Sequence, residues 1–308
     1  MPKSILYLIT LISLSFLANF AGAQDLNWAP ANEFHAVEQN DHSLTKIRED
    51  LKKIKLPPDF HISVFAIVPN AAQMAVSPQG VAVFASTRKG ELWAIADRNK
   101  DRVADEVVRF TPGLLRGPSG ICFSKDGFLY AVEKSRVLIL PAAELAFDYQ
   151  RAPMAEIVLH SSFWPPGTTI DGAHTCEVRS DSKLYIWLEQ GGIIRIDRDG
   201  RNPEFYQDST HVGEMISPNM LSYSGSMFPD KYRNGIFSVQ DGEPTIGARI
   251  IFTSPISKNQ QAEVFAEGWP RPSADDAGSL VDIAQLHDGS ILISDQQAGA
   301  IYRIMYRK

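Results

Sequence analysis

The chain has 308 residues, of which 44% are hydrophobic and 21% are charged, and its formal net charge is −6. Its lysine and arginine residues are scattered, so the sequence offers no basic surface of the kind that binds nucleic acid. No apolar run after residue 20 is long enough to cross a bilayer, so we expect no transmembrane segment in the mature chain. The length suits one repeat domain or two ordinary domains.

The first 23 residues have the organisation of a secretory signal peptide. Lys3 supplies a positive start, an apolar stretch follows over Ile5–Leu17, and Ala21–Ala23 form a cleavage site of small residues. We therefore predict a periplasmic or secreted protein. The alternative is an uncleaved N-terminal anchor helix, for which the apolar stretch is short.

Residues 24–56 are predicted to form a loose arm followed by a short helix. Apolar residues recur at helical spacing over Leu44–Ile54, with charged residues between them. Two prolines then end the helix, and the stretch Phe60–Val68 is typical of a strand. We assign residues 57–308 to one β domain, in which this strand completes the last sheet and removes its open edge.

One pattern of short strands and turns recurs along this domain. In the copy nearest the C-terminus, Leu280–Ile304, two apolar runs flank a turn at His287-Asp288-Gly289, and a third run follows a second turn. Such a three-stranded meander leaves an apolar face and an open edge, so it needs neighbours of its own kind. The earlier copies are Gln73–Ile95, Ser119–Leu140, Ala173–Ile196 and, with a longer connection, Asn219–Gln240.

The spacing of these copies predicts the fold. Their turns are centred near residues 79, 126, 181, 231 and 288, so each unit takes about fifty residues, close to a four-stranded propeller blade. We predict an all-β protein, a β-propeller of four-stranded antiparallel blades with five repeats, and six blades is the alternative. A β-sandwich is disfavoured because its strands do not recur as one unit.

The two cysteines, Cys122 and Cys176, would lie in an oxidising compartment where a disulfide is chemically allowed. Cys122 lies four residues before the turn residue Asp126, whereas Cys176 lies five residues before the turn residue Asp181. Because side chains alternate between the two faces of a strand, an even and an odd count place the two cysteines on opposite faces of their strands. We therefore predict two buried free thiols, with a disulfide as the alternative.

A polar turn rich in aspartate follows the first repeat. Asp97, Asn99 and Asp101 alternate as at the start of an oxygen-rich calcium loop. However, Arg102 stands where such a loop has glycine, and Val108 where it has a bidentate glutamate. A calcium site on the first three residues is therefore one interpretation, and a plain turn between blades is the other.

Several segments resemble PQQ-dependent glucose and sorbosone dehydrogenases. The similarity covers roughly Ile54–Leu140 and Asn219–Ile304, and its clearest segments are Asp101–Val107 (DRVADEV), Met227–Asn234 (MFPDKYRN) and Ser294–Ile304 (SDQQAGAIYRI). The resemblance implies a six-bladed propeller with PQQ in its central mouth and calcium beneath it. One blade of that family has no counterpart here between Pro203 and Pro218, which agrees with five repeats.

The resemblance also implies site residues. The family uses a histidine as general base on a sugar hydroxyl while a hydride passes to PQQ. His174 matches this position if a small gap is allowed, and Asp171 occupies it in a gapless alignment. Tyr223 and Arg249 stand at matching pocket positions, and Arg303 is a further cation for the carboxylates of PQQ. The implied reaction oxidises an aldose or aldehyde and delivers electrons to a periplasmic acceptor.

Two other functions remain open at this stage. The family's other pocket cations are missing, and Asp171, Asp241 and Asp282 would repel a cofactor with three carboxylates. A binding propeller that has lost the reaction is therefore the second hypothesis. The third is a metal-dependent, lactonase-like hydrolase with His174, Glu177 and Asp241 around calcium or zinc, although no H-x-H or H-E-x-x-H spacing supports it.

Overall fold

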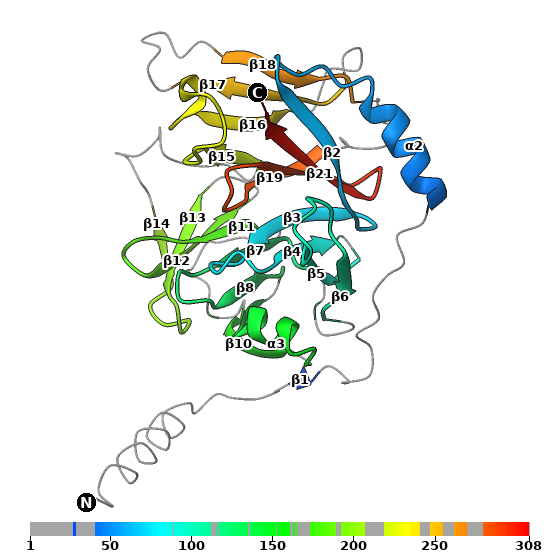
Figure 1. Ribbon diagram of the computed structural model, residues 1–308. Helices are drawn as coiled ribbons and strands as arrows, with labels where there is room; N and C mark the ends of the chain where they lie inside the picture. Colours follow the sequence, from blue (N-terminus) through cyan, green and yellow to red (C-terminus); the bar gives the residue numbers. More distant parts are fainter. Residues whose placement is uncertain are drawn as a thin grey trace, which may run out of the picture.

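Five antiparallel sheets are arranged as blades around a common axis, so the protein is a five-bladed β-propeller (Figure 1). The computed structural model describes residues 27–28, 41–87, 89–111, 115, 117–134, 136–151, 153–160, 163, 165, 173–188, 192–206, 219–240, 247–254, 262–269 and 280–307. The fold class and the number of blades predicted from the repeats are therefore confirmed.

The strands of each blade follow one another from the axis outward. Blade 1 contains β3 (Ala71–Val76), β4 (Val83–Thr87), β5 (Leu92–Ala96) and β6 (Glu106–Arg109). Blade 2 contains β7 (Gly120–Phe123), β8 (Leu129–Val132), β9 (Arg136–Leu140) and β10 (Met154–His160), with β1 (Asn27–Trp28) added at its outer edge. Blade 3 contains β11 (Ala173–Val178), β12 (Lys183–Leu188), β13 (Ile193–Asp197) and β14 (Glu204–Tyr206).

The last two blades continue the same order. Blade 4 contains β15 (Met220–Ser222), β16 (Ile236–Gln240), β17 (Arg249–Thr253) and β18 (Ala262–Glu267). Blade 5 contains β19 (Leu280–Gln285), β20 (Ile291–Asp295), β21 (Ala300–Tyr306) and, from the N-terminal part of the chain, β2 (Phe60–Ile67). The predicted closure of the ring by the Phe60–Val68 strand is confirmed, because β2 pairs with β21 in antiparallel register.

The first hairpin of most blades turns at a residue with positive φ. Gly80, Gly127 and Gly289 have φ values of 71°, 89° and 86°, and Ser182 takes the same conformation at 62°. Glycine adopts this left-handed conformation without steric cost, which is why Gly recurs at this position of the repeat. Blade 4 instead uses the short 3₁₀ helix η2 (Asp230–Tyr232), which accounts for its longer connection.

Two helices accompany the sheets. The helix α2 (Asp41–Leu51) packs against β2, and α3 (Ala143–Asp148) lies between β9 and β10 in the chain (Figure 1). The prediction placed the first helix over Leu44–Ile54. It ends earlier because Ile54 N bonds to Leu51 O, which tightens the last turn to 3₁₀ geometry. Within the described ranges, no helix has both the length and the apolar character needed to span a membrane.

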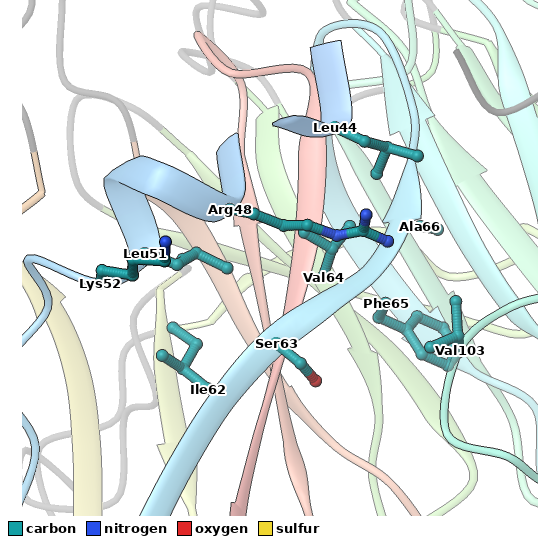
Figure 2. Close-up of a pocket in the computed structure, with 10 residues that line it drawn as sticks. All are labelled: Leu44, Arg48, Leu51, Lys52, Ile62, Ser63, Val64, Phe65, Ala66 and Val103. Atoms are coloured by element: carbon teal, nitrogen blue, oxygen red, sulfur yellow. The ribbon is translucent and has the colours of Figure 1, made fainter. Parts of the chain in front are cut away.

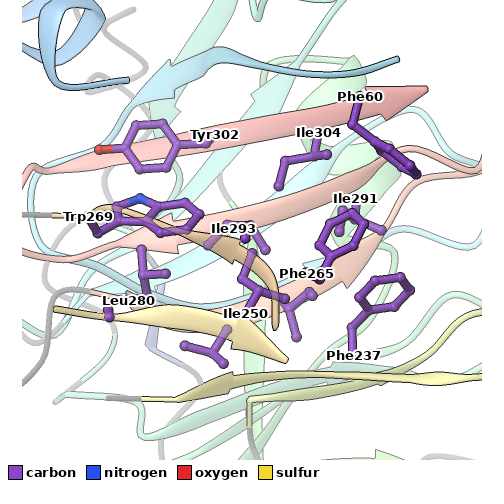
Figure 3. Close-up of a cluster of buried hydrophobic side chains, with 14 of the residues drawn as sticks. Phe60, Phe237, Ile250, Phe265, Trp269, Leu280, Ile291, Ile293, Tyr302 and Ile304 are labelled. Atoms are coloured by element: carbon purple, nitrogen blue, oxygen red, sulfur yellow. The ribbon is translucent and has the colours of Figure 1, made fainter. Parts of the chain in front are cut away.

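The hydrophobic core lies between neighbouring blades. Its largest cluster joins the facing sides of blades 4 and 5 (Figure 3). Phe60 of β2 takes part in it, with its ring centroid 4.8 Å from that of Phe228, 5.4 Å from that of Tyr232 and 5.0 Å from that of Phe265. Because each blade is covered on both faces, strands such as β4 are buried along their whole length.

The five inner strands are not evenly joined around the axis. β15 packs against β19, β19 against β3, β3 against β7, and β7 against β11. In the described part of the chain, β11 and β15 make no comparable contact. This junction between blades 3 and 4 lies where the resembled family has one more blade. Among the described residues, the inner strand of blade 3 thus joins the ring through blade 2.

The prediction of two free thiols is wrong, because Cys122 and Cys176 form a disulfide with a Cα–Cα distance of 5.6 Å. Cys122 lies on β7 and Cys176 on β11, which are the inner strands of adjacent blades. Adjacent blades turn opposite faces toward each other, so residues of opposite parity meet between them. The strands also approach closely here, since a Cβ on Gly120 would lie 2.7 Å from the Cα of Thr175.

The N-terminal predictions remain predictions. The signal peptide, residues 1–23, lies outside the described residues, as does most of the arm before α2.

Candidate functional site

A cavity of about 300 Å³ lies on the propeller axis, and all five inner strands contribute to its wall. The polar side chains that line it are Gln73 of β3, Thr175 and Glu177 of β11, Asn219, and Asp282 of β19. Trp187 of β12 and the Cys122–Cys176 disulfide complete part of the wall. The cavity size and its few polar groups are typical of small-molecule sites.

Asp282 is the carboxyl group most perturbed by this environment. It is half-buried, and its Oδ2 accepts a hydrogen bond from the backbone N–H of Met74 at 2.7 Å, which links blade 5 to blade 1. Burial raises the pKa of Asp282 to about 6, although backbone hydrogen bonds from Met74 and Ile283 oppose the shift. A carboxyl group in a cavity that titrates near neutral pH can bind or transfer a proton.

Glu177 and Trp187 form the wall of the cavity in blade 3. Arg179 Nε donates to Glu177 Oε2 at 3.2 Å, and the guanidinium of Arg179 lies 4.4 Å from the ring centroid of Tyr185 and 5.4 Å from that of Trp187. Trp187 is buried, and its Nε1 has no hydrogen-bond partner among the described residues. The wall therefore presents carboxylate acceptors beside the edge of an aromatic ring, whereas the indole N–H is itself buried and does not face the cavity.

The structure separates the predicted cofactor residues between the two ends of the propeller. We call the end at which the inner strands begin the mouth end, and the end at which they turn into the second strand the base end. His174, near the start of β11, and Arg249, at the start of β17, belong to the mouth end. Tyr223 follows β15 and so belongs to the base end, as does Arg303, which pairs with a turn residue after β19. These four residues are therefore not brought together in one site.

At the mouth end the predicted base lies at an irregular point of β11. His174 lies in β11 where the register with β12 shifts between Ala173 and Thr175. Arg249 is half-buried, and its Nε has no partner among the described residues. Asp171 and Asp241 lie outside the described residues. The assignment of His174 or Asp171 as a general base thus stays a prediction.

At the base end the predicted residues make structural contacts. Tyr223 is fully buried, donates to Gly289 O at 2.8 Å, and accepts from Phe228 N at 3.0 Å. Arg303 donates to Asp288 Oδ2 at 2.6 Å and to Ser290 Oγ at 2.9 Å, with Asp97 Oδ2 at 3.4 Å. Neither Tyr223 nor Arg303 lines the axial cavity.

The candidate calcium loop also lies at the base end. Asp97 Oδ2 accepts from Arg102 N at 2.9 Å, and Asn99 Oδ1 accepts from Asp101 N at 2.9 Å. The described residues contain no group of three or more His, Cys, Asp or Glu placed to hold a metal ion. The hydrogen bonds account for a polar turn, while a calcium site on Asp97, Asn99 and Asp101 remains a prediction.

The residues of the cavity wall do not fit PQQ. This cofactor carries three carboxylates, so its site needs arginine or lysine side chains. The described residues that line the cavity include Glu177 and Asp282 but no Lys, Arg or His. Glu177 is already paired with Arg179, and Asp282 has no cationic partner among the described residues, so this wall offers no free cation to an anionic ligand and its carboxylates disfavour one. We therefore derive no chemistry through PQQ.

Comparison with known proteins agrees with the fold. The chain is similar in structure to a gluconolactonase from Xanthomonas campestris, with a TM-score of 0.51 and 10% identity over 94% of this chain and 99% of that one. It is also similar to the PQQ domain of a pyranose dehydrogenase from Coprinopsis cinerea, with a TM-score of 0.51 and 8% identity over 82% and 97% of the two chains. The likeness shows the fold. At these identities it does not select between the two activities.

Comparison of the sequence with known proteins finds fewer similarities than comparison of the structure. No protein-family model matches the chain. An uncharacterized protein of Borreliella burgdorferi is 30% identical over 113 residues, which are 34% of this chain and 29% of that protein. The chain thus matches under a third of that relative.

The raised pKa of Asp282 predicts a measurable pH dependence of stability. Its pKa of about 6 in the folded state lies above its ordinary value of 3.8, so the folded state holds the proton more tightly. The contribution of Asp282 to the free energy of unfolding should therefore fall by at most about 3 kcal/mol as pH rises from about 4 to 6, and then stay level. Asp282→Asn, which stays neutral, should remove this contribution, leave that of Asp295, whose pKa burial also raises, and make the protein more stable than wild type at pH 8.

Urea unfolding between pH 4 and pH 8 measures this effect. The exposed Asp230→Asn variant serves as the control and should keep the wild-type pH profile. If Asp282→Asn and wild type showed the same dependence of unfolding free energy on pH, burial in the cavity would not raise the pKa of Asp282.

Proposed function

We propose that the axial cavity binds a small, uncharged, polyhydroxylated ligand of the sugar class, without PQQ. The observation that carries this proposal is the composition of the cavity wall. Glu177 and Asp282 come from two different inner strands and supply carboxylates, Asn219 directly precedes a third inner strand and supplies an amide, and Trp187 supplies an aromatic ring.

These groups match the chemistry of a sugar. Sugar hydroxyls donate hydrogen bonds to carboxylates and both donate to and accept from amides. Charge-assisted hydrogen bonds from hydroxyls to Glu177 and Asp282 would be stronger than neutral ones. The apolar C–H face of a sugar ring can pack on the indole of Trp187. A neutral ligand also avoids the repulsion that the two carboxylates impose on an anion.

Calorimetric titration with a panel of neutral aldoses, polyols and sugar lactones tests the proposal. At least one of these ligands should bind with a one-to-one stoichiometry and a Kd between about 1 μM and 1 mM. PQQ, with or without calcium, should not bind in this range. Tight binding of PQQ together with no binding of any neutral sugar would overturn the proposal.

Two substitutions locate the binding. Asp282→Asn and Glu177→Gln should each weaken the binding of the ligand about tenfold or more, since each replaces a charged hydrogen-bond acceptor in the cavity wall by a neutral one. Asp230→Asn is the matched control outside the cavity and should leave the Kd unchanged. Equal affinities in all three variants would place the ligand elsewhere.

Hydrolysis of a lactone is a second candidate, favoured by the pKa of about 6 for Asp282. In this reaction the Asp282 carboxylate takes a proton from water, and the water oxygen attacks the lactone carbonyl carbon. The ring C–O bond then breaks, and the ring oxygen leaves as a hydroxyl with that proton. The rate should depend on an ionisation near pH 6 and fall at least 100-fold in Asp282→Asn. A lactone that binds but is not opened would exclude the hydrolysis.

We also propose an exported location. The Cys122–Cys176 bridge supports it, because disulfides persist in oxidising compartments and are rare in the cytosol. Detection of the mature chain in a periplasmic or culture-medium fraction, with residues 1–23 removed, tests this proposal.

A further inference from the structure

A second cavity lies between the helix α2 and the outermost strand of blade 5, β2 (Figure 2). It has a volume of about 370 Å³ and shares no lining residue with the axial cavity. We call it the α2 groove. Its apolar walls come from α2, from β2 and from the loop after β5, and they include Leu44, Leu51, Ile62, Val64, Phe65 and Val103.

The charged residues of the α2 groove are Arg48 and Lys52, and no acidic residue lines it. Lys52 Nζ pairs with Glu49 at 2.6 Å on the exposed surface of the helix. Arg48 has no ion-pair partner among the described residues, and Figure 2 shows its side chain reaching from α2 across β2 toward Ala66. The groove therefore combines a long apolar wall with one unpaired guanidinium, in a chain whose net charge is −6.

We propose that the α2 groove binds a medium- or long-chain fatty acid, with its carboxylate on Arg48 and its hydrocarbon chain along the apolar wall. A guanidinium pairs with a carboxylate through two parallel hydrogen bonds. Burial of the hydrocarbon chain against Leu44, Ile62 and Val103, which are partly or fully exposed, removes apolar surface from water. A sugar would leave this wall uncovered, and a neutral hydrocarbon would leave Arg48 unpaired.

Titration of the full-length mature chain with dodecanoate, below its micelle concentration, tests this site. Saturable one-to-one binding is expected. Arg48→Gln should weaken it about tenfold or more through loss of the charged hydrogen bonds. Lys46→Gln removes an exposed cation from the same helix that does not line the groove, and it should change the Kd less than twofold. Each methylene removed from the ligand should weaken binding about fourfold.

Three results would overturn the proposal. The first is dodecanol binding as tightly as dodecanoate, because the carboxylate would then be unrecognised. The second is an equal loss in Arg48→Gln and Lys46→Gln, and the third is adsorption to fatty-acid vesicles without binding of the monomer. Val103→Trp, at an exposed residue that lines the groove, should obstruct it and weaken binding with an unchanged circular dichroism spectrum. Asp282→Asn should bind dodecanoate as wild type does, which separates this site from the axial cavity.

Discussion

Replacement of both cysteines by serine is expected to lower the free energy of unfolding by about 4 kcal/mol. The bridge closes a sequence separation of 54 residues, so its loss frees a long loop in the unfolded chain. The effect should be strongest in blade 3, because β11 packs on β7 through this disulfide and makes no comparable contact with β15 in the described part of the chain. Urea unfolding of wild type and the Cys122→Ser, Cys176→Ser variant measures the difference.

Reduction of the wild-type protein provides the control. The chain contains two cysteines, so dithiothreitol should produce the same loss in wild type and no change in the double variant. Hydrogen exchange should show faster exchange in β11 to β13 than in blade 5 after reduction. A loss below about 1 kcal/mol by both routes would mean that blade 3 is held by other contacts.

Phe60→Ala is expected to cost about 4 kcal/mol of unfolding free energy. Phe60 is 7% exposed and lies edge-on to Phe228, Tyr232 and Phe265, which belong to blade 4 and its connections. It also begins β2, the strand that closes the ring against β21. The substitution therefore leaves a cavity beside the strand pair that joins the two ends of the propeller domain. Chemical denaturation measures this loss.

Phe205→Ala is the matched control for Phe60→Ala. Phe205 lies in β14, at the outer edge of blade 3, and is 46% exposed. The same truncation there should cost less than about 1 kcal/mol. Equal losses in the two variants would contradict the role of Phe60 in ring closure.

The blades were predictable from the sequence because their signals are local. Alternating apolar residues and a positive-φ turn residue, as at Gly127 and Gly289, mark each hairpin without reference to the rest of the chain. The strand Phe60–Val68 could be assigned to the last blade because the repeats left it as the missing outer strand. The disulfide was not predicted because the alternation of side chains along one strand shows only which face a cysteine is on. It does not show which faces of two adjacent blades meet.

The candidate site was less predictable. Tyr223 and Arg249 matched the resembled family in position along the chain, but such a match does not tell at which end of the propeller a residue lies, and the structure places these two at opposite ends. Trp187 was not singled out, because an aromatic residue in a central strand is usually a core residue. The position of a residue within the repeat could have indicated the cavity residues. Glu177 and Asp282 each lie on the inner strand of their repeat, before the turn that ends it, and both line the axial cavity.

A crystal structure with the tightest-binding neutral sugar of the panel tests the central claim most directly. The account predicts ligand density in the axial cavity, with sugar hydroxyls within hydrogen-bond distance of the Glu177 and Asp282 carboxylates and the ring against Trp187. Density at any other place with an empty axial cavity, or PQQ held in that cavity by its three carboxylates, would contradict it.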